Sequence, residues 1–356
     1  MMNSNRGRRK KMKVGMYYNN NDVRLENMAV PSIGDSDLLM EVNVSGICGS
    51  DIMEWYRIQK APLVLGHEVT GNVVELGKNV AEFRVGDRIF ATHHVPCDDC
   101  HYCLRGHHTA CETFHSENNF DPGGFAQYLR ITGKSVTKGT LKLPDSVSFE
   151  QGAFIEPLGT VVRGSRAAEV QPGDSMLILG SGLVGLLHIK LARAEGAGRI
   201  IATDMHESRL RFAEEIGADH TIDASADVPS LVREVNEGNL VDKVIVCTGA
   251  SSAATQGLKS VDKGGTVLFF AVPKPGVPIA VDINAFWRDD ISVKVSYGAG
   301  PADNEQALSL ISAGKVTVTD MITHRLSLDA IGEGFRLANE GADSLKVMIE
   351  PNRSGS

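Results

Sequence analysis

Four cysteines fall within fifteen positions of this 356-residue chain, at Cys97, Cys100, Cys103 and Cys111. Thiolates this close together suit a tetrahedral site in which cysteine fills every coordination position, which is typical of structural zinc. A bacterial iron–sulfur motif fits less well, because it has three residues and then a proline around its last cysteine, whereas here seven residues precede Cys111 and Glu112 follows it. A pair of disulfides would require an oxidising compartment, and we expect no export signal.

A second group of metal-binding residue types is spread through the chain. Cys48 lies in a turn between glycines, His67 and Glu68 follow it after 19 residues, and Glu156 comes much further on. Separately, each has a simple structural explanation, as a buried thiol, a hydrogen-bonded histidine or a carboxylate at a helix start. Together they offer one sulfur, one nitrogen and two oxygen donors, the mixed set of a catalytic zinc with an exchangeable position.

A glycine-rich turn follows an apolar run in the middle of the chain. Residues 177–179 lead into Gly180, Gly182 and Gly185 with the spacing G-x-G-x-x-G, and a helical pattern follows. The first glycine permits a tight turn, the second lets the backbone approach a pyrophosphate, and the third lets helix and strand pack closely. The helix N-terminus then offers N–H groups to the phosphates. The pattern predicts a dinucleotide site.

Asp204 ends the next apolar run, 19 residues after Gly185. A carboxylate there accepts hydrogen bonds from the ribose hydroxyls and repels a 2′-phosphate, which favours NAD over NADP. Arg209 lies nearby and could serve a phosphate, although packing beside the adenine or on the helix surface explains it equally well. NAD is therefore the predicted cofactor, with NADP as the less favoured alternative.

Two kinds of sequence pattern predict the elements that position these residues. Residues 13 to about 160 contain short strand-like runs broken by glycine and proline, which indicate an irregular β-rich domain. From residue 175 onward, apolar runs alternate with helical patterns, which predicts a parallel sheet with helices on both faces. We expect the last part, from about 295, to rejoin the first domain.

The expected elements have the following bounds. Strands are expected at 38–44, 69–76, 88–92, 176–179, 200–203, 244–247, 267–272 and 344–349. Helices are expected at 183–195, 207–216, 230–237, 304–313 and 329–339.

Composition excludes several classes of protein. The net charge of −8 argues against binding to nucleic acid or to an anionic membrane surface. The longest apolar run, 177–187, is too short to span a bilayer. The basic residues 1–12 have almost no apolar content, so we expect a disordered arm there.

Taken in order, six motifs resemble those of the zinc-dependent medium-chain dehydrogenase/reductase superfamily. They are C-G-S-D at 48–51, G-H-E at 66–68, G-D-R at 86–88, the four-cysteine segment, E-P-L at 156–158 and G-S-G-L-V-G at 180–185. Within the superfamily the chain is most similar to the sorbitol (polyol)/threonine dehydrogenase branch, over essentially residues 13–350.

The resemblance implies an α/β protein with two domains. A discontinuous, β-rich GroES-like catalytic domain would comprise 13–160 and 296–356, with a structural zinc lobe at 93–115. A Rossmann domain, with a doubly wound parallel sheet that binds NAD, would comprise 161–295.

The resemblance also implies roles for individual residues. Cys48, His67 and Glu68 match the positions of a catalytic zinc, and Glu156 matches a carboxylate that holds this metal directly or through water. Ser50 is placed to pass a proton outward. The four clustered cysteines match a second, structural zinc. The expected cofactor contacts are Gly180, Gly182, Leu183, Val184, Gly185, Asp204, Arg209, Phe270, Ala271, Val272, Ser296 and Tyr297.

Two positions depart from the family pattern. Met53 stands where many relatives have a histidine, and Gly298 follows Tyr297 where polyol dehydrogenases often have an arginine. Both changes disfavour sorbitol itself and suggest a different or less polar substrate.

The sequence predicts a zinc-dependent oxidoreductase that transfers a hydride between a secondary alcohol and NAD. The alcohol would be a polyol, sugar alcohol, cyclitol or hydroxy amino acid. The alternatives are a simple secondary-alcohol dehydrogenase or ketone reductase that uses NADP, a zinc-free quinone or enone reductase, and an NAD-binding structural protein that retains zinc. We expect a cytoplasmic homodimer or homotetramer, without nucleic acid or membrane partners.

Overall fold

The computed structural model describes residues 11–341 and 344–353, which form two units. The first unit runs up to Glu156 and also includes Gly300–Ser312 and the described residues from Val318 onward. The second unit comprises Pro157–Ala299 and Ala313–Thr317. Most of the expected basic arm, residues 1–10, lies outside the described residues. At its end, Met12 already belongs to the first strand and is buried.

The first unit is built on two sheets that are largely antiparallel. The larger has the strand order β16-β17-β3-β5-β6-β9, with β8 pairing with both β3 and β7, and the smaller has the order β2-β1-β4. The strands are β1 (Met12–Asn19), β2 (Asp22–Met28), β3 (Leu38–Gly46), β4 (Leu63–Val64), β5 (Glu68–Leu76), β6 (Arg88–Ala91), β7 (Phe120–Asp121), β8 (Tyr128–Ile131), β9 (Thr140–Lys142), β16 (Ile322–Ser327) and β17 (Lys346–Glu350).

Alternating apolar side chains close the core of the larger sheet. Leu38, Met40 and Val42 of β3 lie on one face and pack against Val69 and Val73 of β5. This period of two residues is what a strand with one buried face requires. In the register, Gly46 at the end of β3 pairs with both Glu68 of β5 and Met348 of β17, so the ends of these three strands lie side by side.

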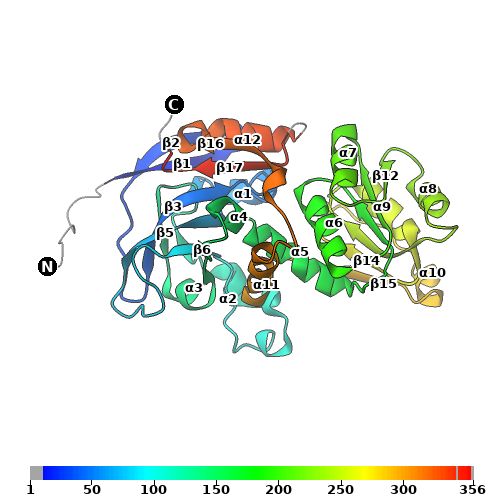
Figure 1. Cartoon of the computed structure of the whole chain (residues 1–356), viewed down its shortest axis with the longest axis horizontal. Coiled ribbons are helices and arrows are strands. Elements are labelled where there is room, and N and C mark those ends of the chain that lie inside the picture. The colour runs from blue at the N-terminus through cyan, green and yellow to red at the C-terminus, as the bar shows by residue number, and fades with distance from the viewer. Residues whose placement is uncertain (1–10, 342–343, 354–356) are drawn as a thin grey trace. The chain divides into compact units, whose positions relative to one another are not determined.

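Short helices cover the first unit. α12 packs against β2, β16 and β17 (Figure 1), and α4 begins with a capping box of Ser148 and Gln151. Its helices are α1 (Glu54–Arg57), α2 (Glu112–Ser116), α3 (Gly133–Lys138), α4 (Phe149–Ala153), α11 (Pro301–Ser312) and α12 (Ile331–Glu340), with the first two residues of α5 (Ile155–Ala168). Among the described residues, no helix has both the length and the apolar character to cross a membrane.

The second unit contains a six-stranded parallel sheet. The strand order is β12-β11-β10-β13-β14-β15, which is the doubly wound Rossmann order in which the chain direction reverses beside the first strand. The elements are β10 (Met176–Leu179), α6 (Leu183–Glu195), β11 (Ile200–Asp204), α7 (Glu207–Glu215), β12 (His220–Asp223), α8 (Val228–Val235), β13 (Val241–Val246), α9 (Ser251–Ser260), β14 (Val261–Phe269), α10 (Ile283–Arg288) and β15 (Ser292–Val295).

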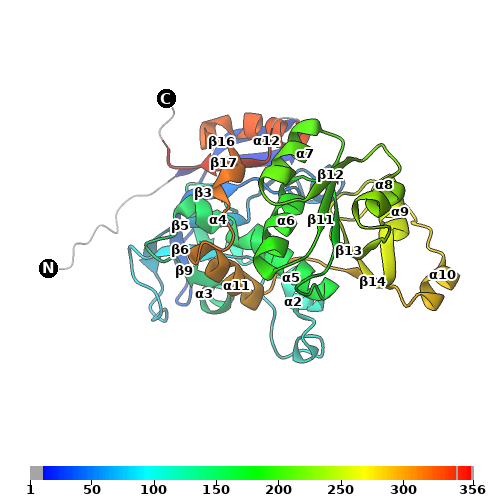
Figure 2. The same ribbon diagram turned by 45° about the vertical axis from the view of Figure 1, so that its right-hand side comes forward.

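Helices cover both faces of this sheet. α8 and α9 pack on the face that presents Val267 and Phe269 of β14 (Figure 2). Leu268 points to the opposite face, because side chains alternate along a strand, and there it lies close to Gly164 of α5. The α/β fold class predicted from the sequence is therefore confirmed.

Candidate metal centres and cofactor site

Three of the predicted ligands of the catalytic metal meet where β3 and β5 lie side by side. Cys48 follows the end of β3, His67 immediately precedes β5, and Glu68 is its first residue. One ligand atom from each, a sulfur, a nitrogen and a carboxylate oxygen, lie within 4.8 Å of one another. His67 and Glu68 are buried. The three side chains offer the mixed donor set of a catalytic zinc site.

The carboxylate of Asp51 contacts two of these three ligand residues. Its Oδ2 accepts a hydrogen bond from the backbone N–H of Cys48 at 3.0 Å, and its Oδ1 lies 3.4 Å from Nδ1 of His67. Burial alone would raise the pKa of Asp51, but His67 and Arg57 hold it below its ordinary value. An ionised carboxylate this close to Nδ1 favours a proton there, which would leave Nε2 as the ligand nitrogen. Asp51 is part of the C-G-S-D motif at 48–51, but the sequence pattern did not predict a role for it.

A buried ion pair also lies at the site. The ammonium of Lys346, from β17, contacts Oε2 of Glu68 and donates to the carbonyl oxygen of Ile47 at 3.1 Å, and neither charged side chain is exposed to solvent. Only a glycine fits at position 46, because a Cβ there would collide with this pair. Oε1 of Glu68 is buried and has no hydrogen-bond partner among the described protein atoms. A buried, unpartnered carboxylate oxygen fits a site that binds a cation.

Glu156 lies at the start of α5 and is only 6% exposed. Burial raises the pKa of its carboxyl to about 7, and Glu68 acts in the same direction while His67 and Lys346 oppose it. Glu156 is thus within electrostatic reach of the cluster but is not part of the group of three ligand atoms. Its predicted role as a fourth ligand remains a prediction.

Ser50 is held beside the site by Arg57. The guanidinium donates from Nε to the carbonyl oxygen of Ser50 at 2.9 Å and from NH2 to its hydroxyl oxygen at 3.0 Å. Because a guanidinium has only donors, the Ser50 hydroxyl keeps its own proton to donate elsewhere. Arg57 had no role in the sequence prediction, since nothing in its local pattern separates it from a surface arginine.

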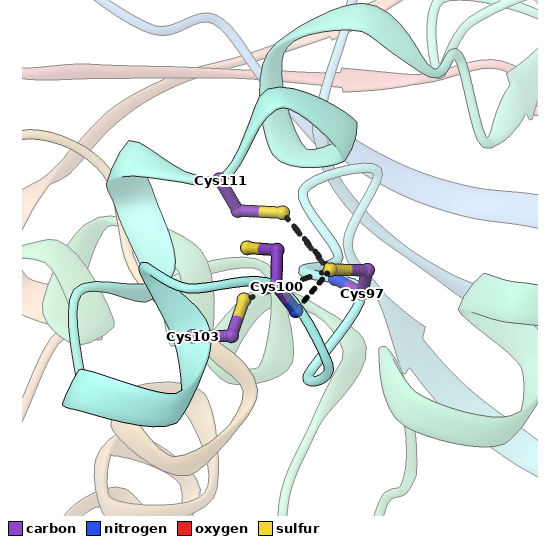
Figure 3. Close-up of side chains that lie close together, drawn as sticks. All are labelled: Cys97, Cys100, Cys103 and Cys111. Carbon is purple, nitrogen blue, oxygen red and sulfur yellow. Dashed lines mark hydrogen bonds between the residues drawn. The ribbon is translucent and has the colours of Figure 1, made fainter.

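The four clustered cysteines converge from one loop and its short helices (Figure 3). The sulfur of Cys97 lies 3.5 Å from that of Cys111 and 3.9 Å from that of Cys103. A tetrahedron with metal–sulfur bonds of about 2.3 Å places its sulfurs about 3.8 Å apart. These spacings fit a four-thiolate zinc site, and all six cysteines of the chain are free, so no disulfide competes for these sulfurs.

The glycine turn joins β10 to α6 as predicted. Gly180 has φ of +98°, in the left-handed region that favours glycine. At Gly185, a Cβ would collide with the carbonyl oxygen of Gly180. Leu183 and Val184 of the turn are half-buried, and a Cβ at Gly182 would meet only the guanidinium of Arg209, at 3.9 Å. The backbone of this turn is therefore accessible to a phosphate ligand.

Asp204 ends β11, next to the turn. Its carboxylate accepts from the backbone N–H groups of Ser181 at 2.9 Å and His206 at 3.0 Å, and Arg209 lies 3.7 Å away. Sequence reasoning missed His206, although a histidine two residues after the ribose-binding carboxylate is a visible signal.

The other predicted cofactor contacts lie at the same edge of the sheet. Phe270, Ala271 and Val272 follow β14, and Ser296 and Tyr297 follow β15. The carboxyl ends of parallel strands form one edge, where ligands of this fold bind. The second unit thus gathers all the predicted contacts at its ligand-binding edge.

Family comparisons agree with both units. The description "Alcohol dehydrogenase GroES-like domain" matches residues 34–145, and "Zinc-binding dehydrogenase" matches residues 184–313. The chain belongs to the zinc-dependent medium-chain dehydrogenase/reductase superfamily, in its sorbitol (polyol) dehydrogenase branch. The predicted family and the predicted class of enzyme are confirmed: the chain is a zinc-dependent alcohol/polyol dehydrogenase.

Individual relatives support this placement. Mouse sorbitol dehydrogenase is 34% identical over 344 residues, covering 93% of this chain and 94% of its own. Sorbitol dehydrogenase of Bacillus subtilis is 31% identical over 359 residues, covering 96% and 98%. Among solved structures, a zinc-binding dehydrogenase from Sinorhizobium meliloti bound to NADP has a TM-score of 0.86 at 29% identity, covering 96% of this chain and 99% of that chain. The 2R,3R-butanediol dehydrogenase of Bacillus subtilis has a TM-score of 0.82 at 27% identity, covering 96% and 100%.

Proposed function

We propose that this enzyme oxidises a secondary alcohol of the polyol type with NAD, using Cys48, His67 and Glu68 to hold the catalytic zinc. The observation that carries the proposal is the convergence of their three ligand atoms within 4.8 Å, in a buried setting where Asp51 lies 3.4 Å from Nδ1 of His67. Glu156 is the fourth proposed ligand, directly or through water.

The mechanism is hydride transfer from the carbinol carbon. When bound, zinc supplies the Lewis acidity that lowers the pKa of the substrate hydroxyl, and NAD supplies the hydride acceptor. Asp51, whose Oδ1 lies 3.4 Å from Nδ1 of His67, favours a proton on that nitrogen. Ser50 accepts the alcohol proton on a lone pair that Arg57 does not use and passes its own proton outward.

The test of the metal site is Cys48→Ser, with Cys247→Ser as the matched control. Cys247 follows β13 in the second unit and belongs to neither group of candidate metal ligands. We expect Cys48→Ser to reduce the zinc content from two ions per chain to one, to abolish NADH formation with a panel of polyols, cyclitols and hydroxy amino acids, and to leave nucleotide binding intact. Normal turnover by this variant after removal of zinc would contradict the mechanism.

NAD is the proposed cofactor because Asp204 is ionised where an adenosine ribose would lie. Its pKa is held below the ordinary value, since hydrogen bonds from His206 and the charge of Arg209 outweigh the effect of burial. Parallel assays with NAD and NADP test this, and a strong preference for NADP would contradict it.

We also propose that the enzyme is a homodimer or homotetramer. β15 is the last strand in the sheet order, so its outer edge has no partner strand within the described part of the chain. Large apolar side chains are exposed along β15 and α10: Val293, Val295, Ile283 and Trp287. An exposed apolar edge of this kind is typically covered by another chain. Light scattering tests this assembly, and Val295→Lys should shift the mass to that of one chain.

We propose a cytoplasmic location. All six cysteines are free, and a thiolate metal site requires cysteines that are kept reduced. Fractionation of the native host tests the proposal.

A further inference from the structure

Asp204 has unusually few positions left for a ligand. Its Oδ1 accepts from the backbone N–H of His206 at 3.0 Å and also lies 2.9 Å from Nδ1 of the same residue. Its Oδ2 accepts from the backbone N–H of Ser181 at 2.9 Å and lies 3.7 Å from NH1 of Arg209. The side chain is only 8% exposed. The carboxylate that would receive the ribose is therefore surrounded by donors of its own chain.

The imidazole of His206 is the donor that can leave. An ionised carboxylate only accepts, so Nδ1 carries the proton in the contact with Oδ1. The side chain is 49% exposed and makes no capping bond to the helix α7 that begins beside it. The ring can therefore rotate into solvent or toward a ligand without creating a cavity, whereas the backbone N–H groups of Ser181 and His206 are fixed.

This inference rests on the proposed use of NAD. We propose that His206 is a specificity-determining residue, because its ring competes with the adenosine 2′-hydroxyl for Oδ1 of Asp204 and serves as a donor to a 2′-phosphate. Arg209 lies on the other side of the same carboxylate and offsets the charge that would repel the phosphate. The enzyme consequently discriminates less between NAD and NADP than a lone carboxylate would.

The test measures nucleotide affinity directly, by calorimetry on the zinc-loaded enzyme. The probes are 5′-AMP, which has a 2′-hydroxyl, and adenosine 2′,5′-bisphosphate, which has a 2′-phosphate. We expect His206→Ala to bind 5′-AMP about threefold to tenfold more tightly and the bisphosphate more weakly by a similar factor, since one hydrogen bond contributes about that much. The ratio of kcat/KM for NAD over NADP should rise accordingly.

Two further variants make the result specific. His206→Gln keeps a neutral donor but cannot carry a positive charge, so it should lose affinity for the bisphosphate while its affinity for 5′-AMP stays near that of the wild type. His220→Ala removes a histidine from the neighbouring strand β12 and should change neither affinity. Thermal unfolding of each variant establishes that it is folded.

The outcomes separate the two proposals. Equal changes in the affinity of both probes, or no change, in a folded His206→Ala would overturn the role of His206 while leaving the use of NAD intact. Failure of the wild type to bind either probe, or NAD, would instead overturn the proposed cofactor and with it this role.

Discussion

Replacement of Lys346 by methionine should expose how the charges at the metal site are balanced. The ammonium of Lys346 and the carboxylate of Glu68 are both fully buried, and methionine has a similar volume without the charge. Breaking a buried ion pair by removing one partner costs about 3–5 kcal/mol, because the remaining charge has lost its compensation. In the metal-free protein, the first unit should therefore unfold roughly 6–20 °C lower, given about 2–4 °C per kcal/mol for a domain of this size.

Zinc should reduce this loss. In the zinc-loaded protein, a cation beside Glu68 would take over part of the compensation, so the same substitution should lower the melting temperature by less. Calorimetry of the metal-free and zinc-loaded forms measures both values. The double variant Glu68→Gln/Lys346→Met removes both charges and should recover most of the stability in the metal-free form.

Lys190→Met provides the matched control. Lys190 is also buried, but it lies in the second unit and donates to the carbonyl oxygen of Thr317 at 2.9 Å. The decrease in melting temperature caused by Lys190→Met should be the same with and without zinc. If the loss for Lys346→Met is below about 1 kcal/mol, or does not depend on zinc, then Glu68 is not a buried charge shared between lysine and metal, and the reasoning is refuted.

Two other predictions concern titration and the second metal. Burial lowers the pKa of His188 to about 3, so below pH 6.5 the unfolded chain binds a proton that the folded chain does not. The free energy of unfolding should therefore be highest above about pH 6.5 and should fall by about 2 kcal/mol by pH 5. Chemical denaturation at both pH values checks this, and a His188→Leu variant with the same pH dependence would contradict it. Cys100→Ser should lose one zinc ion and fold poorly, because structural zinc contributes folding free energy, whereas Cys247→Ser should keep both zinc ions. Metal analysis together with circular dichroism tests this. A stable Cys100→Ser variant with two zinc ions would rule out the proposed site.

The second unit could be predicted closely because its signals are local. The strand Met176–Leu179 and the helix Leu183–Glu195 have the bounds that the sequence predicted, since an apolar run and glycines mark both ends. β14 was less predictable. It begins at Val261, before the expected 267, because its first residue pairs with Val241 of β13, and a register shift separates that pairing from the rest. Pairing with a neighbouring strand is not visible in the local pattern.

The limit of sequence reasoning is clearest at Lys346. A lysine at the start of a strand is normally expected at the surface, and no residue within its own segment indicates otherwise. Its burial follows from the pairing of both Met348 and Glu68 with Gly46, which places β17 and β5 on either side of the end of β3, where the side chains of Lys346 and Glu68 meet. Since no motif encodes this register, a role for the lysine could be found only in the folded chain.

The charges gathered by that register explain why the metal ligands alone do not complete the site. With a metal bound, the cluster would contain four anionic groups and two fixed cations: Cys48, Asp51, Glu68 and Glu156, with Arg57 and Lys346. In the chain alone, Asp51 and Cys48 raise the pKa of His67 well above its ordinary value despite its burial, so its imidazolium is a third cation. Buried charges are stable only when they are compensated, and once His67 has lost its proton to bind a metal, the remaining cations number two fewer than the anions. The raised pKa of Glu156 follows from its burial among these groups, because protonation of its carboxyl removes one negative charge. A divalent cation held by Cys48, His67 and Glu68 would supply the missing charge, and for this reason the positions of Lys346 and Arg57 belong to the metal site as much as its ligands do.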